Sequence, residues 1–167
     1  MGITTSASDK ICKYKQYKLD ANKKIHQLID EAYQIFKSYL YGKNLNFENE
    51  QVDFKTEKNI FTFREQSFEH LISKQINKPH VRIYDKNRIV HIPYIETILN
   101  QCCNESCENL KIFRDDKYIC VWCEMIDFLI VLSKREKKGY LLLTAYPITY
   151  PNKRKTLKKT YMKNNNV

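Results

Sequence analysis

Hydrophobic positions recur with a helical period in the first part of the chain. Over residues 19–41, apolar side chains return every three or four positions, and Lys, Gln, Asp and Glu fill the places between them. This spacing is typical of an amphipathic helix. Asp20 is a suitable N-cap and Gly42 a suitable stop. The pattern therefore predicts a helix over residues 19–41, preceded by a flexible arm at residues 1–15.

The period then changes twice before the middle of the chain. Residues 47–64 alternate between polar and apolar side chains, which predicts a β-hairpin. Residues 64–75 return to helical spacing and predict a second helix, followed by a connection at residues 82–88. A third, short helix is predicted at residues 91–102, with Pro93 in its first turn, where a missing N–H is tolerated.

The second half of the chain has the pattern of a β-meander. Four apolar runs are separated by short polar turns, at residues 109–113, 118–124, 128–133 and 140–148. Short turns favour antiparallel neighbours. The expected fold class is α+β, with N-terminal helices packed on a C-terminal four-stranded antiparallel β-meander. We expect one domain over residues 16–163 and a short disordered tail at residues 164–167.

Positive charge is concentrated at the C-terminal end. The whole chain carries a net charge of +10, and the segment from Lys134 to Val167 holds ten Lys or Arg and one acidic residue, hence +9. Such asymmetry favours a polyanionic partner, most often nucleic acid, although a solvated tail that aids solubility is the alternative. No apolar run reaches the roughly 18–20 residues of a membrane helix, and no signal-peptide core is present. We therefore expect a cytoplasmic protein without a membrane partner.

Most of the cysteines fall in two groups. These five are Cys102, Cys103, Cys107, Cys120 and Cys123. Their spacing could suit a zinc ribbon, so a zinc-stapled interaction module is one interpretation. Cys120 and Cys123, however, lie in an apolar strand pattern without Gly or Pro, and their two thiols would point to opposite faces. Small buried thiols are the favoured interpretation, and a disulfide framework is not expected in a cytoplasmic chain.

The known phosphate-binding and hydrolytic motifs are missing from the sequence. There is no Walker A loop, no dinucleotide-binding glycine pattern, no His-Glu-x-x-His, no nucleophile elbow and no acidic cluster spaced for Mg²⁺. An enzyme built from this chain that acts on a phosphate polymer is therefore expected to need neither metal nor other cofactor. Cleavage of RNA by its own 2′-hydroxyl requires only a base, an acid and stabilisation of the developing charge.

Two segments before the meander offer residues for that chemistry. His70 lies on the polar side of the second predicted helix, one turn from Lys74, and histidine titrates near neutral pH. Arg88 precedes the short helix and lies close in sequence to His91. Each of these residues, taken alone, equally fits an ordinary place on the protein surface.

The last strand and the basic run after it complete the candidate set. Thr144 and Tyr146 alternate so that they share one face of the strand, although packing at a strand end would also explain them. Lys153, Arg154 and Lys155 follow and could bind phosphates of an RNA backbone.

The order of three motifs resembles a known family. They are "FEHL" at Phe68–Leu71, "RIVHIPYI" at Arg88–Ile95 and "LLTAYPI" at Leu142–Ile148, the last at the end of the meander. Over about residues 45–160, this order is similar to that of the phage- and plasmid-borne nucleases of the barnase/EndoU/colicin/RelE-like (BECR) superfamily. The resemblance implies a helical part against a four-stranded antiparallel sheet. It also implies a metal-independent endoribonuclease, often a toxin with a cognate antitoxin or immunity protein.

The resemblance further implies an active site of His70, Arg88, Thr144 and Tyr146. In this interpretation His70 is the general base or acid, with His91 as its rival, and Arg88 clamps the scissile phosphate. Tyr146 orients the phosphate or serves as acid, Thr144 hydrogen-bonds a phosphate oxygen, and the product is a 2′,3′-cyclic phosphate. The alternative is a non-catalytic nucleic-acid-binding protein that uses the same groove.

Overall fold

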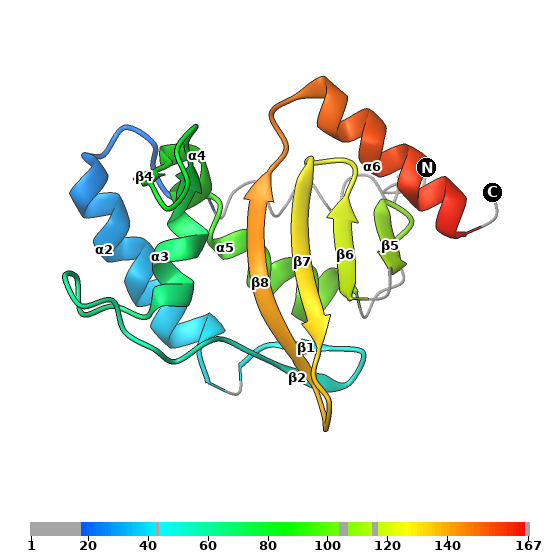
Figure 1. Ribbon diagram of the computed structural model, residues 1–167, viewed down its shortest axis with the longest axis horizontal. Helices are drawn as coiled ribbons and strands as arrows, with labels where there is room; N and C mark the ends of the chain where they lie inside the picture. The colour runs from blue at the N-terminus through cyan, green and yellow to red at the C-terminus, as the bar shows by residue number, and fades with distance from the viewer. Residues whose placement is uncertain (1–17, 43, 104–106, 115–116, 166–167) are drawn as a thin grey trace, which may run out of the picture.

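The computed structural model describes residues 18–42, 44–103, 107–114 and 117–165 of the chain (Figure 1). Its helices are α2 (Ile25–Ile35), α3 (Gln66–Ile72), α4 (Lys86–Val90), α5 (Pro93–Glu96) and α6 (Pro151–Asn164), and π-helical turns extend two of them as η2 (Phe36–Leu40) and η3 (Thr97–Cys102). None of the helices in these ranges combines the length and the apolar character that crossing a bilayer requires.

The strands form one large sheet and one small ribbon. Their bounds are β1 (Asn46–Phe47), β2 (Glu50–Asp53), β3 (Ser73–Gln75), β4 (Arg82–Tyr84), β5 (Leu110–Arg114), β6 (Tyr118–Cys123), β7 (Phe128–Lys134) and β8 (Tyr140–Pro147). The large sheet has six strands in the order β1-β2-β8-β7-β6-β5, and β3 pairs with β4 in the ribbon. The protein is thus an α+β fold in which the helices are interspersed with the strands.

The first helix is shorter than the sequence predicts. Helix α2 begins at Ile25, because Asp20 instead closes a turn in which its carboxylate accepts a hydrogen bond from the Asn22 amide at 2.9 Å. The apolar stripe of α2 and η2 lies in the core. Gly42 follows the helix end with a φ of +85°, a conformation that favours glycine, so the predicted stop is in place.

The predicted β-hairpin is wrong in its position. The structure places a hairpin earlier, where β1 pairs antiparallel with β2. Its turn residues Glu48 and Asn49 both have positive φ, as tight hairpin turns require. The second half of the predicted hairpin, Ile60 to Phe63, is instead a loop that exposes large apolar side chains. Sequence alternation alone did not distinguish this loop from a strand.

The sheet contains six strands rather than the predicted four. Strands β5, β6, β7 and β8 pair antiparallel in chain order, as their short turns predict. The difference arises at the edge beyond β8, where β2 joins in parallel with Val52 opposite Tyr140. β1 then follows β2 as the outermost strand.

The two faces of the sheet are covered by different helices. One face carries Val121, Cys123 and Ala145 into the main core, which it shares with α2, α3, α4 and α5. The opposite face carries Trp122 and Leu129, and α6 covers it through Leu157. Figure 1 shows α6 crossing the upper part of the sheet, whereas α3 lies on the side of β8 and α2 lies beyond α3.

Helix α6 corrects the interpretation of the basic C-terminal segment. The sequence predicts only a basic run after the last strand, but residues 151–164 form a regular helix. Leu157 is the one buried side chain of this helix. The segment therefore has almost no apolar stripe from which a helix could be predicted. The helix includes Asn164, the first residue of the predicted tail, while residues 166–167 and the predicted arm at residues 1–15 lie outside the described residues.

Candidate functional site

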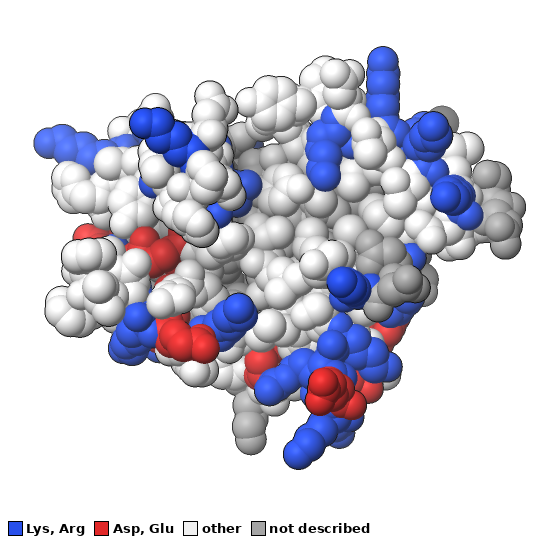
Figure 2. Space-filling view, in the orientation of Figure 1, with Lys and Arg blue, Asp and Glu red and all other residues white. Residues whose placement is uncertain are grey.

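A cavity of about 680 Å³ opens between α3, the β3–β4 ribbon, α4 and the end of β8. All four predicted catalytic residues line it: His70, Arg88, Thr144 and Tyr146. Two of the predicted RNA-binding residues, Lys74 and Lys153, also line it. We call this space the site cavity. Figure 2 shows a hollow on this face with Lys and Arg side chains on either side of it.

Helix α3 presents His70 to the site cavity because its other face is apolar. Phe68, Leu71 and Ile72 are buried in the core, and His70 lies on the open side of the same short helix. Successive residues of a helix point about 100° apart, so burial of the apolar stripe turns His70 away from the core. His70 remains exposed to solvent on the cavity side.

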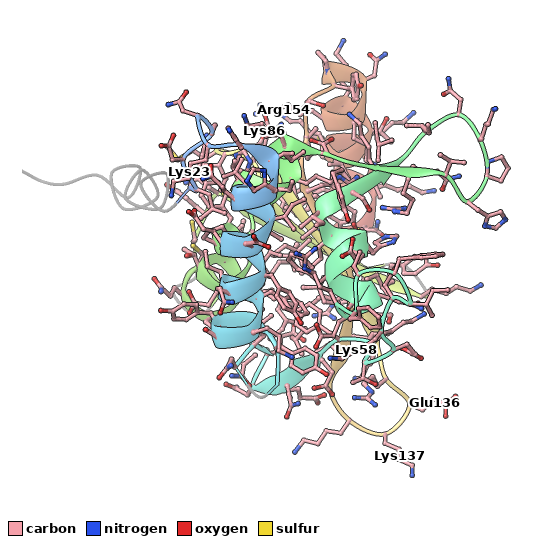
Figure 3. All side chains as sticks on the ribbon, turned by 90° about the vertical axis from the view of Figure 1, so that its left-hand side faces the viewer. Lys23, Lys58, Lys86, Glu136, Lys137 and Arg154 are labelled. Carbon is pink, nitrogen blue, oxygen red and sulfur yellow. The ribbon has the colours of Figure 1, made fainter. Side chains whose placement is uncertain are left out.

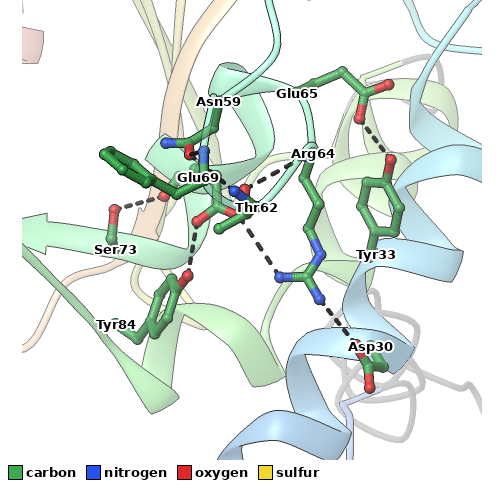
Figure 4. Close-up of polar contacts among 10 residues, drawn as sticks. Asp30, Tyr33, Asn59, Thr62, Arg64, Glu65, Glu69, Ser73 and Tyr84 are labelled. Atoms are coloured by element: carbon green, nitrogen blue, oxygen red, sulfur yellow. Dashed lines mark hydrogen bonds and ion pairs between the residues drawn. The ribbon is translucent and has the colours of Figure 1, made fainter.

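The beginning of α3 is anchored by a buried carboxylate. Glu65, only 1% exposed, accepts hydrogen bonds from the Tyr33 hydroxyl at 2.9 Å and from the Lys37 ammonium at 2.6 Å, both from the first helical segment. Burial alone would raise the pKa of Glu65, but the bonds from Lys37, the backbone and Tyr33 outweigh it, and the pKa is lowered. The Tyr33–Glu65 bond is drawn in Figure 4. These bonds tie α3, and therefore His70, to α2.

Two guanidinium groups converge beside His70. Arg82 from β4 and Arg88 from α4 both donate to the carbonyl oxygen of Ser73, at 2.6 and 2.9 Å. Arg82 also donates to the Ser73 hydroxyl at 2.9 Å and to the carbonyl oxygen of His70 at 3.2 Å. These bonds hold both guanidinium groups in fixed positions next to one another.

The paired arginines carry positive charge that no ion pair neutralises among the described residues. Within the described residues, no carboxylate forms an ion pair with Arg82 or Arg88. Burial lowers the pKa of both groups, and the charge of Arg82 lowers that of Arg88 further. Asp85, whose charge raises the pKa of Arg88, forms an ion pair with Lys74 at 3.1 Å. An anion entering the site cavity would relieve this repulsion.

Strand β8 turns Thr144 and Tyr146 toward the site cavity. Ala145 between them is buried in the main core, so strand alternation places its two neighbours on the other face, as the sequence predicts. The Arg88 guanidinium carbon lies 4.8 Å from the centre of the Tyr146 ring, a cation–π contact. This contact joins the helical part of the site to the sheet.

The surroundings of His70 favour its neutral form. Partial burial lowers the pKa of its imidazole, and the positive charges of Arg82, Arg88 and Lys55 lower it further. The imidazole is therefore largely unprotonated at neutral pH. A neutral imidazole can accept a proton, which is what a general base does.

His91 is not part of the site, which corrects a prediction. Its side chain is 8% exposed, and its Nδ1 lies 2.6 Å from the Asn87 carbonyl oxygen. The ring packs against Tyr94 at 5.0 Å between centroids and lies over Phe128. His91 therefore helps to form the core and is not placed to contact RNA or to replace His70.

The basic residues at the start of α6 diverge. Lys153 lines the site cavity, but Arg154 pairs with Asp127 at 2.6 Å and with Glu124 at 3.8 Å, and Lys155 is exposed without lining the cavity. Arg154 is labelled in Figure 3, on the helix at the top of the view. Successive residues of a helix point about 100° apart. Of these three cations, only Lys153 is therefore placed to contact a phosphate in the site cavity.

The cysteines do not come together as a metal site in the described residues. Cys123 packs in the main core and Cys120 on the face covered by α6, so the two thiols point to opposite faces, as predicted. No group of three or more His, Cys, Asp or Glu side chains in the described part of the chain is placed to hold a metal ion. Burial raises the pKa of the Cys103 thiol to about 12, which disfavours the thiolate that zinc needs.

Arg82 and a second cavity were not predicted from the sequence. This cavity, of about 840 Å³, adjoins the site cavity and shares His70 and Arg82 with it. The run Val-Arg-Ile-Tyr at residues 81–84 has strand character that could have indicated β4. Its partner strand, residues 73–75, reads Ser-Lys-Gln and has no strand character. The pairing of the two strands could therefore not be predicted.

Comparisons of the chain with protein-family models, with curated proteins and with solved structures returned no match. The features that bear on function are therefore the chemistry of the site cavity and the order of the sequence motifs.

Proposed function

We propose that this protein is a metal-independent endoribonuclease that cleaves RNA in the site cavity. The observation that carries the proposal is the meeting of His70, Arg88, Thr144 and Tyr146 in one cavity, beside an arginine pair that lacks an ion-paired carboxylate among the described residues. Fixed guanidinium groups suit phosphate because they donate in a planar fork. A neutral imidazole next to them supplies the base.

The proposed reaction begins at the ribose 2′-hydroxyl. His70 takes its proton, and the 2′-oxygen attacks the adjacent phosphorus. The bond from phosphorus to the 5′-oxygen then breaks, and the Tyr146 hydroxyl gives that oxygen a proton. The products are a 2′,3′-cyclic phosphate and a 5′-hydroxyl, and water returns the proton from His70 to Tyr146. Arg88 stabilises the additional negative charge of the transition state, and the Thr144 hydroxyl donates to a phosphate oxygen.

Arg82 enters the proposal as a residue that the motifs did not suggest. It is held against Ser73 and the His70 carbonyl, and it lowers the pKa of the His70 imidazole. We assign it two roles, a second phosphate contact and a group that keeps His70 neutral. Lys74 and Lys153, on the rim of the site cavity, would contact neighbouring phosphates of the chain.

The biological role in the proposal is that of a toxin acting on RNA in the cytoplasm. Support comes from the resemblance to BECR nucleases and from the net charge of +10. A cognate antitoxin or immunity protein would need to cover the site cavity, and acidic side chains would complement Arg82, Arg88 and Lys153 there. Growth on induced expression of the parent and of His70→Ala tests this part directly, and we expect toxicity only from the parent.

A non-catalytic nucleic-acid-binding protein is the second candidate. The observation in its favour is that Arg82, Arg88 and Lys153 can bind phosphate without any proton transfer. Both candidates predict RNA binding, so only cleavage distinguishes them.

The deciding experiment is incubation of end-labelled RNA with purified protein in EDTA across a range of pH. We expect cleavage with 2′,3′-cyclic ends, and its loss in His70→Ala and Tyr146→Phe. The matched control is His26→Ala, because His26 is an exposed histidine on α2 outside the site cavity. Intact RNA with the parent protein would refute the endoribonuclease. Equal cleavage by parent and variants would show that the active site lies elsewhere.

A further inference from the structure

The second cavity differs in character from the site cavity that it adjoins. Its wall is formed by the loop at residues 59–63, α3 and the β3–β4 ribbon, which projects from the body of the protein (Figure 3). Phe61, Ile83 and Tyr84 give this wall an apolar and aromatic surface. The site cavity, in contrast, is lined by several cations. The two spaces meet at His70 and Arg82.

The second cavity has less positive charge than the site cavity, because Arg82 and Glu69 both line it. Glu69 lines it, and its carboxylate accepts a hydrogen bond from the Tyr84 hydroxyl at 3.0 Å. Glu69 also forms an ion pair with Arg64 at 3.7 Å. A phosphate finds more positive charge in the site cavity, where Arg88, Lys74 and Lys153 join Arg82. A flat, uncharged group needs no positive charge and can contact the rings of Phe61 and Tyr84.

The loop that carries Phe61 is built to hold it in place. The Asn59 side-chain oxygen accepts hydrogen bonds from the amides of Phe61 at 2.9 Å and Thr62 at 3.1 Å. Arg64 then fastens the loop to α2 by an ion pair with Asp30 at 2.9 Å (Figure 4). The backbone of a loop fixed in this way loses little conformational entropy when a ligand stacks on Phe61.

Exposure alone would not identify Phe61. Ile60, Phe61 and Phe63 are 75%, 84% and 73% exposed on the same loop, but of these three only Phe61 lines the second cavity. Phe63 therefore offers a matched control, with the same side chain, the same loop and nearly the same exposure.

We propose that the second cavity binds one unpaired nucleobase, stacked on Phe61, next to the phosphate held in the site cavity. This inference rests on the proposed function, because RNA must occupy the site cavity for the adjoining base to reach Phe61. A base in a duplex is already stacked and paired, so the subsite selects single-stranded RNA. Base stacking on aromatic side chains tolerates every base, so this contact selects strandedness rather than sequence.

The test is binding of a fluorescent oligonucleotide whose 2′-hydroxyls are all replaced by 2′-O-methyl groups, so that no cleavage occurs. Anisotropy titrations use the full chain as parent, Phe61→Ala and Phe63→Ala. We expect Phe61→Ala to weaken binding by about tenfold, the size of one base stack, and Phe63→Ala to leave it unchanged. A duplex of the same sequence should bind more weakly than the single strand to the parent.

An oligonucleotide with abasic sugars separates stacking from phosphate contacts. The parent and Phe61→Ala should bind it equally, because the ring then has no base to cover. Three results would overturn the inference. Phe61→Ala could bind the normal strand as tightly as the parent does, or Phe63→Ala could lose as much affinity as Phe61→Ala. The third is that Phe61→Ala also weakens binding of the abasic oligonucleotide. Failure of the proposed function is seen in RNA cleavage rather than in these binding titrations. A protein that gives the expected binding pattern but leaves RNA intact in EDTA has the base subsite without the nuclease.

Discussion

The guanidinium of Arg88 stacks over the ring of Tyr146, with 4.8 Å between the guanidinium carbon and the ring centre. The two residues come from α4 and from β8, and their contact fixes the positions of both across the site cavity. Arg88 is held on its other side by the Ser73 carbonyl oxygen. A planar, delocalised cation can make both contacts at once, which a lysine ammonium cannot do.

Replacement of Arg88 by Lys should therefore impair catalysis although the charge is retained. We expect kcat/KM for RNA cleavage to fall by about 10²–10³-fold, the usual cost of losing one donor to a transition-state oxyanion. Affinity for a non-cleavable strand should change much less. Lys86→Ala is the matched control, because Lys86 is an exposed cation on the same helix. Parent-like cleavage by Arg88→Lys would contradict the assigned role of Arg88.

The pH dependence of cleavage should report the lowered pKa of His70. If His70 is the base, activity rises with pH as its imidazole loses a proton and levels off above that pKa. Because burial and then Arg82 and Arg88 lower this pKa, the rise should lie below the ordinary histidine value of about 6.5. Arg82→Gln removes one of these charges and should move the rise to higher pH. Imidazole NMR shifts of His70 should give the same pKa, and a midpoint above 6.5 would contradict this assignment.

Much of the fold was predictable because it depends on local alternation and helical spacing. Strands β5 to β8 and the apolar face of α3 follow directly from these periods, and so does the shared face of Thr144 and Tyr146. The pairing of β2 with β8 was not predictable in this way. It joins residues far apart in the chain, and only four residues of β2 carry the signal.

The candidate site was predictable only as far as its residues sit in recognisable motifs. His70 lies on a helix with a clear apolar face, which fixes where it points. Arg88 was expected in a connection, whereas the structure places it in the short helix α4. Arg82 lies in a three-residue strand whose partner has no strand pattern, and His91 looks polar in sequence although it is buried. In both cases tertiary packing, rather than local propensity, decides the place of the side chain.

The Glu65 anchor should make the free energy of unfolding depend on Lys37 and on pH. Lys37→Met leaves a buried carboxylate without its cation and should destabilise the protein by about 1–3 kcal/mol. Because the pKa of Glu65 is lowered on folding, its contribution is complete above the unfolded value of about 4.3 and is lost as pH falls through the folded value. Urea unfolding at several pH values measures both effects.

The control for Lys37 is Lys23→Met. Lys23 also pairs with a carboxylate, that of Glu31, but both partners are well exposed to solvent. Ion pairs between exposed side chains contribute little, because water and salt screen them, so this variant should unfold almost as the parent does. If Lys23→Met and Lys37→Met lowered the free energy of unfolding equally, the burial of Glu65 would not explain the contribution of its ion pair to stability.

The parallel pairing of β2 with β8 should depend on the absence of a side chain at Gly139. A Cβ atom there would lie 2.6 Å from the Gln51 carbonyl oxygen, closer than any real contact, and the φ of +85° is itself unfavourable for alanine. Gly42 has the same φ, but a Cβ there would meet no atom within 4 Å. Gly42→Ala should therefore cost only the backbone strain, about 1–2 kcal/mol. Gly139→Ala should cost clearly more, because the two strands must also separate. Thermal unfolding of both variants measures the difference, and equal midpoints would mean that β2 is not held against β8 as closely as the structure shows.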